Sequence, residues 1–286
     1  MFPFRQITRI NINRLPKSMT YYLNEDRADE DVTTKLTVPE DMVSKANIEA
    51  QSPLVFAGGE IINCIFEECQ VELLVKDGDA INSGDIIANL EGNARYMLSR
   101  ERVMLNLIQR LSGIATAARK YSDVTKPFGV DILDTRKTTP GLRRFEKYAV
   151  NVGGAKNHRF DLKSAILIKD NHIAAAGGIK NVVENIKNSK HSKLFTELEV
   201  DTKEQLIEAL ELGLRAFLLD NMSPELIKEC VAIIRSQPNG ENIFVEASGG
   251  VTYDTLADYA ATGINAISVG ALTHRIVSAD IHMNFI

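Results

Sequence analysis

Cysteine and long apolar runs are scarce in this sequence. Only three of the 286 residues are cysteine, and Cys64 and Cys69 have no cysteine or histidine partners at the spacing of a zinc site. We interpret all three as reduced thiols of a cytosolic protein that fill space as small buried hydrophobes. The longest nearly apolar run, Ile173 to Ile179, is far shorter than the ~18 residues that would span a bilayer. Residues 1–9 also lack the apolar stretch of a secretory signal.

The overall composition is that of an ordinary globular protein. Hydrophobic residues make up 44% of the chain and charged residues 25%, which excludes a disordered tail, a coiled coil and a collagen-like repeat. The formal net charge of −5 gives no indication of nucleic-acid binding. Within this acidic chain, however, residues 134–172 hold nine lysines and arginines against four acids. Such a basic segment is typical of a site for a small, multiply charged anion, although charge alone favours a solvated basic surface.

Residues 1 to about 110 contain short strand-like runs separated by turn signals. We predict strands at 47–51, 60–66, 71–75 and 86–90, with Asp-Gly and Ser-Gly pairs between some of them. A helical pattern follows from about residue 94 to residue 121 and is predicted to bridge the two halves of the chain. Gly113 weakens the middle of this helix and would allow a bend there.

Strand and helix patterns alternate regularly in the second half. Six mostly apolar runs are predicted strands: 130–133, 165–168, 196–200, 216–219, 243–247 and 266–269. Helix start signals lie between them, such as Thr202 with Gln205 in a capping-box pattern and Ser223 before Pro224. Repeated strand–helix units with apolar strands predict a parallel sheet covered by helices.

The ends of the predicted strands distinguish a barrel from an open sheet. No Gly-x-Gly-x-x-Gly motif follows an early strand, so the dinucleotide-binding type of open sheet has no support. Polar, charged or glycine residues follow every predicted strand: Asp134–Lys137, Lys169–His172, Glu199 with Asp201, Asp220–Asn221, Ser248–Gly250, and Gly270 leading to His274. Six such strand ends in succession predict a (β/α) barrel with a site on its C-terminal face.

The residues predicted at this face form a cationic group and an acidic group. The cationic group suits carboxylates and phosphates, and consists of Arg136, Lys137, Arg159 and Lys169, with His158 available. Glu199 and Asp220 come from adjacent strands and suit Mg²⁺ shared with a substrate phosphate, or the hydroxyls of a sugar. Ion pairs with the lysines are the simpler alternative for these two carboxylates.

Two glycine-containing segments are typical of a phosphate site after the last two strands of a barrel. Ser248-Gly249-Gly250 precedes a helix expected to begin near Thr252, and Gly270 follows the final strand. Glycine lets backbone N–H groups approach an anion, and a helix N-terminus adds partial positive charge. The predicted substrate therefore has a terminal phosphate and a hydroxylated linker, as in a phosphorylated sugar, with a carboxylate-bearing reactant beside it.

Several runs of the sequence together carry a family resemblance. They are Asp31–Thr34, Glu101–Thr116, Asp134–Arg143, Glu146–Ala155, Asn157–Arg159, Ile168–His172, Glu199–Asp201, Leu219–Asn221, Ser248–Gly250 and Val269–His274. In this order they resemble the quinolinate phosphoribosyltransferases, also called nicotinate-nucleotide pyrophosphorylases (carboxylating), over nearly the whole chain. The combination of Arg-Lys-Thr-Thr-Pro-Gly with Lys-Asp-Asn-His is highly specific.

The resemblance implies a reaction and a fold. Quinolinate and phosphoribosyl pyrophosphate would give nicotinate mononucleotide, pyrophosphate and CO₂ with Mg²⁺, in de novo NAD biosynthesis. The implied α/β fold is an incomplete TIM-like (β/α) barrel, residues 113–286, with a smaller N-terminal α/β sandwich domain, residues 1–112, on which the last residues can pack back. A cytoplasmic homodimer, or a multiple of dimers, is expected, with no nucleic-acid or membrane partner.

The resemblance also implies roles for individual residues. Arg136, His158 and Arg159 would bind the two carboxylates of quinolinate, and Arg102 would be donated across the dimer interface. Lys137 and Lys169 would contact phosphates, while Glu199 and Asp220 would bind ribose hydroxyls and Mg²⁺, directly or indirectly; these four are the catalytic candidates. The remaining substrate-binding candidates are Thr135, Ser248, Gly249, Gly250, Gly270 and His274.

One segment departs from the family pattern, and three alternative functions remain. Residues 160–164 contain Asp161 and Ser164 where many bacterial members read roughly Met-Gly-Leu-x-Asp, which we interpret as a subgroup difference. A paralogue of the same fold could use another acceptor such as nicotinate, although the set for two carboxylates argues against it. An aldolase-type barrel with Lys169 as Schiff base would leave Arg136 and Arg159 unexplained. A non-catalytic sensor of NAD precursors would bind ligand without turnover.

Overall fold

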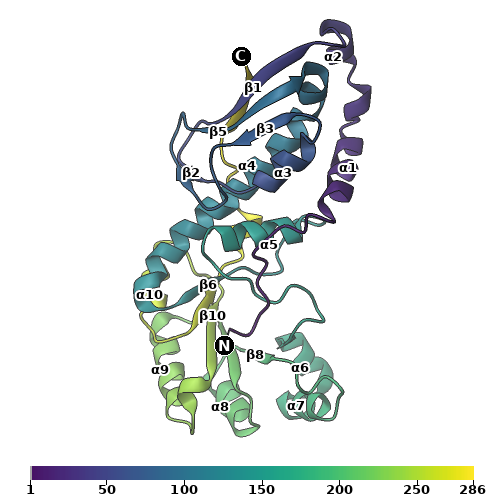
Figure 1. Ribbon diagram of the computed structural model, residues 1–286. Coiled ribbons are helices and arrows are strands. Elements are labelled where there is room, and N and C mark those ends of the chain that lie inside the picture. Colours follow the sequence, from purple (N-terminus) through teal and green to yellow (C-terminus); the bar gives the residue numbers. More distant parts are fainter. Residues whose placement is uncertain (1) are drawn as a thin grey trace. The chain divides into compact units, whose positions relative to one another are not determined.

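A computed structural model describes residues 2–286, and the chain forms two compact units (Figure 1). The barrel unit comprises residues 2–6, 120–137 and 155–271, and the N-terminal unit comprises residues 7–119, 138–154 and 272–286. The two units are therefore interleaved along the chain, whereas the domains predicted from the sequence, 1–112 and 113–286, are continuous segments.

The barrel unit is built on one parallel sheet of six strands. Their order across the sheet is β6 (Asp131–Leu133), β11 (Ala266–Ser268), β10 (Phe244–Ser248), β9 (Ala216–Asp220), β8 (Thr196–Val200) and β7 (Ile166–Ile168). β6 and β7 stand at the two ends of this order, and Lys156 forms a parallel bridge with Leu133 of β6. The predicted fold class, an incomplete α/β barrel with a smaller α/β domain, is confirmed.

Helices follow the strands of the barrel unit as the sequence predicts. They are α6 (Asp170–Ala176), α7 (Ile179–Lys187), α8 (Lys203–Glu211), α9 (Pro224–Arg235) and α10 (Leu256–Ala260). The side chain of Thr202 accepts a hydrogen bond from the Gln205 N–H, and that of Ser223 accepts one from the Leu226 N–H, which confirms both predicted caps. The prediction of a helix start near Thr252 is wrong, because residues 252–255 form a turn stabilised by the Thr255 hydroxyl.

The N-terminal unit combines an antiparallel sheet with helices. Its sheet has the order β12 (Ile281–Phe285), β1 (Val43–Ala50), β5 (Ile86–Asn93) and β3 (Gln70–Leu73), and β2 (Leu54–Val55) pairs with β4 (Ala80–Ile81). The helices of this unit are α1 (Leu15–Glu25), α2 (Val32–Thr37), α3 (Gly59–Ile65), most of α4 (Ala94–Thr125), α5 (Arg143–Val152) and the end of α11 (Ala271–His274). Because β12 pairs with β1, the last residues of the chain complete this sheet.

Two details of the N-terminal unit correct the sequence predictions. Residues 60–65 lie in helix α3 instead of a strand, because Ile61, Ile62 and Ile65 recur at helical spacing and all three are buried. Helix α4 continues through Gly113 without interruption. A Cβ at Gly113 would lie 2.3 Å from the Val277 carbonyl oxygen, so glycine is needed there for close approach of the two backbones. Among residues 2–286, no helix is both long enough and apolar enough to cross a membrane.

The N-terminal segment fills part of the barrel interior. Phe4 is 6% exposed and packs with Leu133, Ala165 and Ala266 in one core cluster, against which Phe2, Phe195 and Phe244 also pack. The Phe4 ring makes edge contacts with Phe195 and Phe244 and stacks on the ring of His158 at 4.2 Å between centroids. Residues 2–6 are therefore a structural part of the barrel.

Replacing Phe4 by alanine should lower the free energy of unfolding by about 3 kcal/mol, because a buried aromatic ring is lost and a cavity remains. Chemical denaturation monitored by circular dichroism measures this loss. Phe128→Ala in the same unit is the matched control, since Phe128 is 47% exposed and should change stability by less than about 0.5 kcal/mol. Equal losses in the two variants would contradict the role assigned to Phe4.

Candidate active site

Charged side chains gather at the C-terminal ends of β7, β8 and β9. Lys169 follows β7 directly, and its ammonium group forms an ion pair with Glu199 on β8. Asp220 ends β9, where it pairs in register with Ser248 of β10. Burial raises the pKa of both carboxyl groups, and the Lys169 ammonium opposes the rise in each case; Lys137 also opposes it at Asp220. The predicted catalytic candidates are therefore neighbours in the barrel unit.

The loop after β10 is held against the loop after β9. Asn221 adopts a left-handed conformation with φ 53°, and its N–H donates to the Ser248 carbonyl oxygen at 2.9 Å. Its Nδ2 donates to Asp220 Oδ2 at 2.6 Å. Gly249 has φ +79°, and a Cβ there would lie 2.1 Å from Asn221 Oδ1. The predicted Ser248–Gly250 segment is thus a tight loop that only glycine permits at position 249.

A buried carboxylate joins the two loops that carry the remaining cations. Asp134 is fully buried at the end of β6, just before Thr135, Arg136 and Lys137. Its Oδ1 accepts from the His158 N–H at 2.8 Å, and its Oδ2 accepts from Asn157 Nδ2 at 2.8 Å. The 134–137 loop and the 157–159 loop are therefore tied together through one side chain.

Gln6 fixes the 157–159 loop from its other side. Its Oε1 accepts from the Asn157 N–H at 2.8 Å, and its Nε2 donates to the Asn157 carbonyl oxygen at 3.1 Å. Sequence reasoning missed the roles of Gln6 and Asp134. For Asp134 the signal was available, since an acid stands immediately after an apolar strand; for Gln6 no local signal exists.

Two arginines of these loops lie near each other. Arg159 is 6% exposed, and its Nη1 donates to the Ala165 carbonyl oxygen at 3.0 Å. Burial and the nearby positive charge of Arg136 both lower the pKa of Arg159, with Glu197 opposing. Nε and Nη2 of Arg159 have no hydrogen-bond partner within residues 2–286. Two guanidinium groups whose charges act on each other favour a ligand with more than one negative charge.

His158 lies inside the barrel and is 5% exposed. Its Nδ1 accepts from the Arg159 N–H at 2.8 Å, and its Nε2 lies 3.3 Å from Glu197 Oε2 and 3.4 Å from Glu246 Oε2. Burial lowers the pKa of the ring, but the two carboxylates raise it and the net direction is upward. The hydrogen bond accepted at Nδ1 opposes this rise, because a second ring proton would break it.

Glu197 and Glu246 are buried acids that sequence reasoning missed. Both are at most 1% exposed, and they occupy interior positions of β8 and β10. Burial and the neighbouring Glu246 raise the pKa of Glu197 to about 7. For Glu246 the available signal was an acid between apolar residues of a strand, and for Glu197 it was strand alternation, which places Glu197 on the same face as Glu199.

Two site candidates belong to the N-terminal unit. Arg102 is exposed on α4 and borders a hollow lined also by Glu101, Gln109 and residues 281–284. His274 is exposed at the end of α11. The other candidates, Thr135, Arg136, Lys137, His158, Arg159, Lys169, Glu199, Asp220, Ser248, Gly249, Gly250 and Gly270, all belong to the barrel unit.

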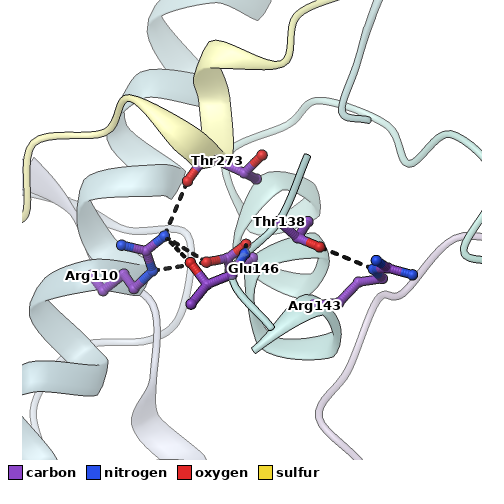
Figure 2. A network of polar contacts seen from close by, with 6 residues as sticks. Arg110, Thr138, Arg143, Glu146 and Thr273 are labelled. Carbon is purple, nitrogen blue, oxygen red and sulfur yellow. Dashed lines mark hydrogen bonds and ion pairs between the residues drawn. The ribbon is translucent and has the colours of Figure 1, made fainter. Parts of the chain in front are cut away.

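A buried ion pair organises the segments of the N-terminal unit that follow Lys137 and precede His274 (Figure 2). Arg110 donates to Glu146 Oε1 from Nε at 2.8 Å and from Nη2 at 2.6 Å. Nη2 also lies 2.8 Å from Thr139 Oγ1 and 3.0 Å from the Thr273 carbonyl oxygen. Glu146 Oε2 accepts from the Thr139 N–H at 3.1 Å. One arginine thus fixes both segments.

The divergent segment 160–164 forms a local turn. The Ser164 hydroxyl accepts from the Asp161 N–H at 3.2 Å and donates to the Asp161 carbonyl oxygen at 3.1 Å. Asp161 Oδ1 accepts from the Lys163 N–H at 3.1 Å. In this chain the two departing residues therefore stabilise their own loop.

Comparison with known proteins identifies relatives over nearly the whole chain. The family model for the quinolinate phosphoribosyl transferase C-terminal domain matches residues 114–284, and the N-terminal domain model matches residues 31–112. A probable nicotinate-nucleotide pyrophosphorylase (carboxylating) of Bacillus subtilis is 42% identical, covering 96% of this chain and 94% of its own. A chloroplastic Arabidopsis thaliana protein named nicotinate-nucleotide pyrophosphorylase (carboxylating) is 38% identical, covering 88% and 77%. The structure of the nicotinate-nucleotide pyrophosphorylase of Francisella tularensis superposes with a TM-score of 0.91 at 34% identity, covering 99% of each chain.

Proposed function

Because the chain belongs to the quinolinate phosphoribosyltransferase family, we infer that it transfers a phosphoribosyl group from phosphoribosyl pyrophosphate to quinolinate. The transfer releases pyrophosphate, and loss of CO₂ leaves nicotinate mononucleotide, a step of de novo NAD biosynthesis. The observation that carries this function is the pair of neighbouring arginines, Arg136 and Arg159, in the same unit as the Lys169–Glu199 ion pair and Asp220. The two arginines match a dicarboxylate, and the Lys169–Glu199 pair with Asp220 matches a phosphorylated sugar.

Quinolinate is bound through its two carboxylates by Arg136 and Arg159. Nε and Nη2 of Arg159 are available among the described residues, and a guanidinium fork can hold a carboxylate with two parallel hydrogen bonds. The ring of His158, the third member of the expected set, lies in the barrel interior. Direct contact with quinolinate is therefore assigned to the two arginines.

The phosphoribosyl donor is bound by the strand ends and the glycine loop. Lys137 and Lys169 contact phosphates, with Thr135, the backbone of Ser248–Gly250 and Gly270 beside them; His274 is assigned to the same region. Glu199 and Asp220 accept hydrogen bonds from the ribose hydroxyls. Both carboxyl groups are partly desolvated, which strengthens each such hydrogen bond relative to water.

The acidic pair also fits a role in holding Mg²⁺. Glu199 and Asp220 are carboxylates whose pKa values are raised by burial, so a divalent cation nearby would favour their charged forms. Bound Mg²⁺ would supply positive charge to the departing pyrophosphate. The Lys169 ammonium, which is paired with Glu199, would also supply positive charge to the departing pyrophosphate.

The chain's own residues contribute positioning and charge. Lys137 and Lys169 stabilise the negative charge that develops on pyrophosphate as the ribose C1 becomes oxocarbenium-like. Arg136 and Arg159 orient quinolinate so that its ring nitrogen attacks C1 from the open side. The pyridinium formed then accepts the electron pair of the breaking C2–carboxylate bond, CO₂ leaves, and a proton is taken up at C2.

A direct assay tests the function. The protein is mixed with phosphoribosyl pyrophosphate, Mg²⁺ and either quinolinate or nicotinate, and CO₂ and mononucleotide are measured. Product from quinolinate and none from nicotinate is the expected result. Product from nicotinate alone would overturn the acceptor assignment, and tight quinolinate binding without turnover would support a sensor.

Replacing Arg159 by lysine should raise the KM for quinolinate about tenfold or more while the KM for phosphoribosyl pyrophosphate changes less than about twofold. A lysine keeps the charge but loses the planar fork. The control is Arg235→Lys in the same unit, where the guanidinium donates to the carbonyl oxygens of Gly240 and Ile243. Equal changes in both KM values for Arg159→Lys would contradict the assignment.

We also propose a cytoplasmic homodimer, or a multiple of dimers, in which Arg102 enters the active site of the partner subunit. An Arg102→Ala protein mixed with an Arg136→Ala protein should then recover activity, because each mixed dimer has one site free of both substitutions. Random reassortment would restore up to about a quarter of the wild-type rate. Verified mixed dimers without recovery would exclude a shared site.

A further inference from the structure

His158 differs from the two arginines of the proposed quinolinate site because its side chain is enclosed by protein. One face of the ring stacks on Phe4 at 4.2 Å between centroids. Each ring nitrogen faces a protein group: Nδ1 accepts from the Arg159 N–H at 2.8 Å, and Nε2 lies 3.3 Å and 3.4 Å from carboxylate oxygens of Glu197 and Glu246. A ring in this position offers no free polar atom to a substrate.

The hydrogen bond at Nδ1 determines what the ring can do. A nitrogen that accepts a hydrogen bond carries no hydrogen, so the ring hydrogen stands on Nε2, where it points between the two carboxylates. Nε2, Glu197 and Glu246 lie close enough together to surround a metal ion. A metal on Nε2 would, however, displace the hydrogen that the acceptor at Nδ1 requires to be there. The arrangement is that of a hydrogen-bond donor facing two acceptors.

Burial of the two carboxylates has a large desolvation penalty. Glu197 and Glu246 are at most 1% exposed, and their carboxylate oxygens accept no hydrogen bond among residues 2–286; one oxygen of each faces His158 Nε2, at 3.3 Å and 3.4 Å. Apolar side chains of similar volume would fill this space with less desolvation. We therefore assign the two carboxylates a role in orienting the group that they face, which is the His158 ring.

Resting on the proposed function, we propose that His158 is a positioning residue that acts through Nδ1 on the main chain of Arg159, and that Glu197 and Glu246 hold its ring in the required orientation. Arg159 is then fixed at two points, its N–H by His158 and its Nη1 by the Ala165 carbonyl oxygen. Its Nε and Nη2 remain for the quinolinate carboxylate. Fixing both ends matters because a two-pronged contact loses strength when the fork shifts by about 1 Å.

Two substitutions of His158 separate positioning from direct contact. Asparagine places an oxygen close to the position of Nδ1, so His158→Asn retains the acceptor for the Arg159 N–H but cannot reach as far as Nε2. Glutamine places its amide close to the position of Nε2, so His158→Gln retains a group there and loses the acceptor. The dissociation constant for quinolinate is measured by calorimetry and both KM values by steady-state kinetics, with thermal unfolding as the check on folding.

The expected result is quinolinate affinity within about threefold of wild type for His158→Asn and about tenfold weaker or more for His158→Gln, with the KM for phosphoribosyl pyrophosphate unchanged within about twofold. The reverse order would overturn the proposal, because it would show that the group at Nε2 contacts quinolinate. Equal loss in both variants would overturn it as well.

A second pair of substitutions, at Glu246, tests the role of the carboxylates. This test remains valid even if a His158 variant does not fold. Glu246→Gln keeps an acceptor for Nε2–H, whereas Glu246→Leu fills similar space without one. Glu246→Gln should bind quinolinate within about threefold of wild type and Glu246→Leu about fivefold more weakly or worse. Normal affinity in a folded Glu246→Leu protein would overturn the holding role. If the wild-type protein used nicotinate alone, the proposed function would be overturned. The same variants measured with nicotinate would then still test the contact from His158 Nδ1 to the Arg159 N–H.

Discussion

Replacing Gly249 by alanine should reduce kcat/KM by about a hundredfold or more in a protein that still folds. The new Cβ would lie 2.1 Å from Asn221 Oδ1, and the backbone at this position has φ +79°. Neither strain can relax locally, because Asn221 is held by the Ser248 carbonyl oxygen and by Asp220. The loop must therefore move and carry Asp220 with it, and displacement of reacting groups by about 1 Å can cost a hundredfold in rate.

Steady-state kinetics and circular dichroism test this expectation. Gly213→Ala is the matched control, because Gly213 ends helix α8 with φ +88° and a Cβ there would have no atom within 4 Å. Gly213→Ala places an alanine in the left-handed conformation, which lowers stability by about 1 kcal/mol, but its Cβ contacts no neighbouring atom. The control should lose stability and keep its kinetic constants. A Gly249→Ala protein with kinetics like those of the control would show that the loop does not transmit the displacement to the site.

Replacing Arg110 by methionine should lower the free energy of unfolding by about 3 to 5 kcal/mol, because it leaves a buried carboxylate without its counter-charge. Glu146 is fully buried, and its carboxylate accepts two hydrogen bonds from Arg110 (Figure 2) and one from the Thr139 N–H. Denaturant unfolding measures the loss. The double variant Arg110→Met with Glu146→Gln should recover part of the stability, since the remaining side chain is uncharged.

A surface ion pair provides the comparison for Arg110. Lys203 and Glu229 lie 2.6 Å apart with side chains 39% and 59% exposed. Lys203→Met should cost much less stability than Arg110→Met, because solvent replaces the lost partner. A loss from Arg110→Met no larger than this would mean that water reaches Glu146 in the variant and that the network in Figure 2 does not depend on the arginine.

The strand ends of the barrel were predictable because their signals are local. Five of the six strands are short, mostly apolar runs, with β8 the exception, and polar or glycine residues stand at or shortly after the C-terminal end of every strand; parallel strands bring such ends to one edge. The same reasoning located Lys169, Glu199 and Asp220 together. The prediction of a strand at residues 60–66 was wrong. The isoleucines in this segment favour a strand by propensity, but their spacing favours a helix. The helix forms because its isoleucine face is buried.

The groups that support the site were not predictable, because their partners are distant in sequence. Gln6 and Asn157 are separated by 151 positions and yet share two hydrogen bonds. The stacking of Phe4 on His158 spans a similar interval. Neither residue type signals such a contact, since a glutamine or phenylalanine near a terminus is ordinary in any sequence. Only the folded chain shows that this terminal segment supports the loop carrying Arg159.

The interleaving of the two units has a consequence for biosynthesis on the ribosome. Residues 2–6 leave the ribosome well before Phe244 and Ala266, their partners in the barrel, and at ~5–20 residues per second the interval is on the order of ten seconds or more. Strand β1 waits over a similar interval for β12, its partner in the N-terminal unit. Neither unit can therefore be finished before residues 266–285 have been made. Both are completed at nearly the same moment, when residues 266–285 become free to fold.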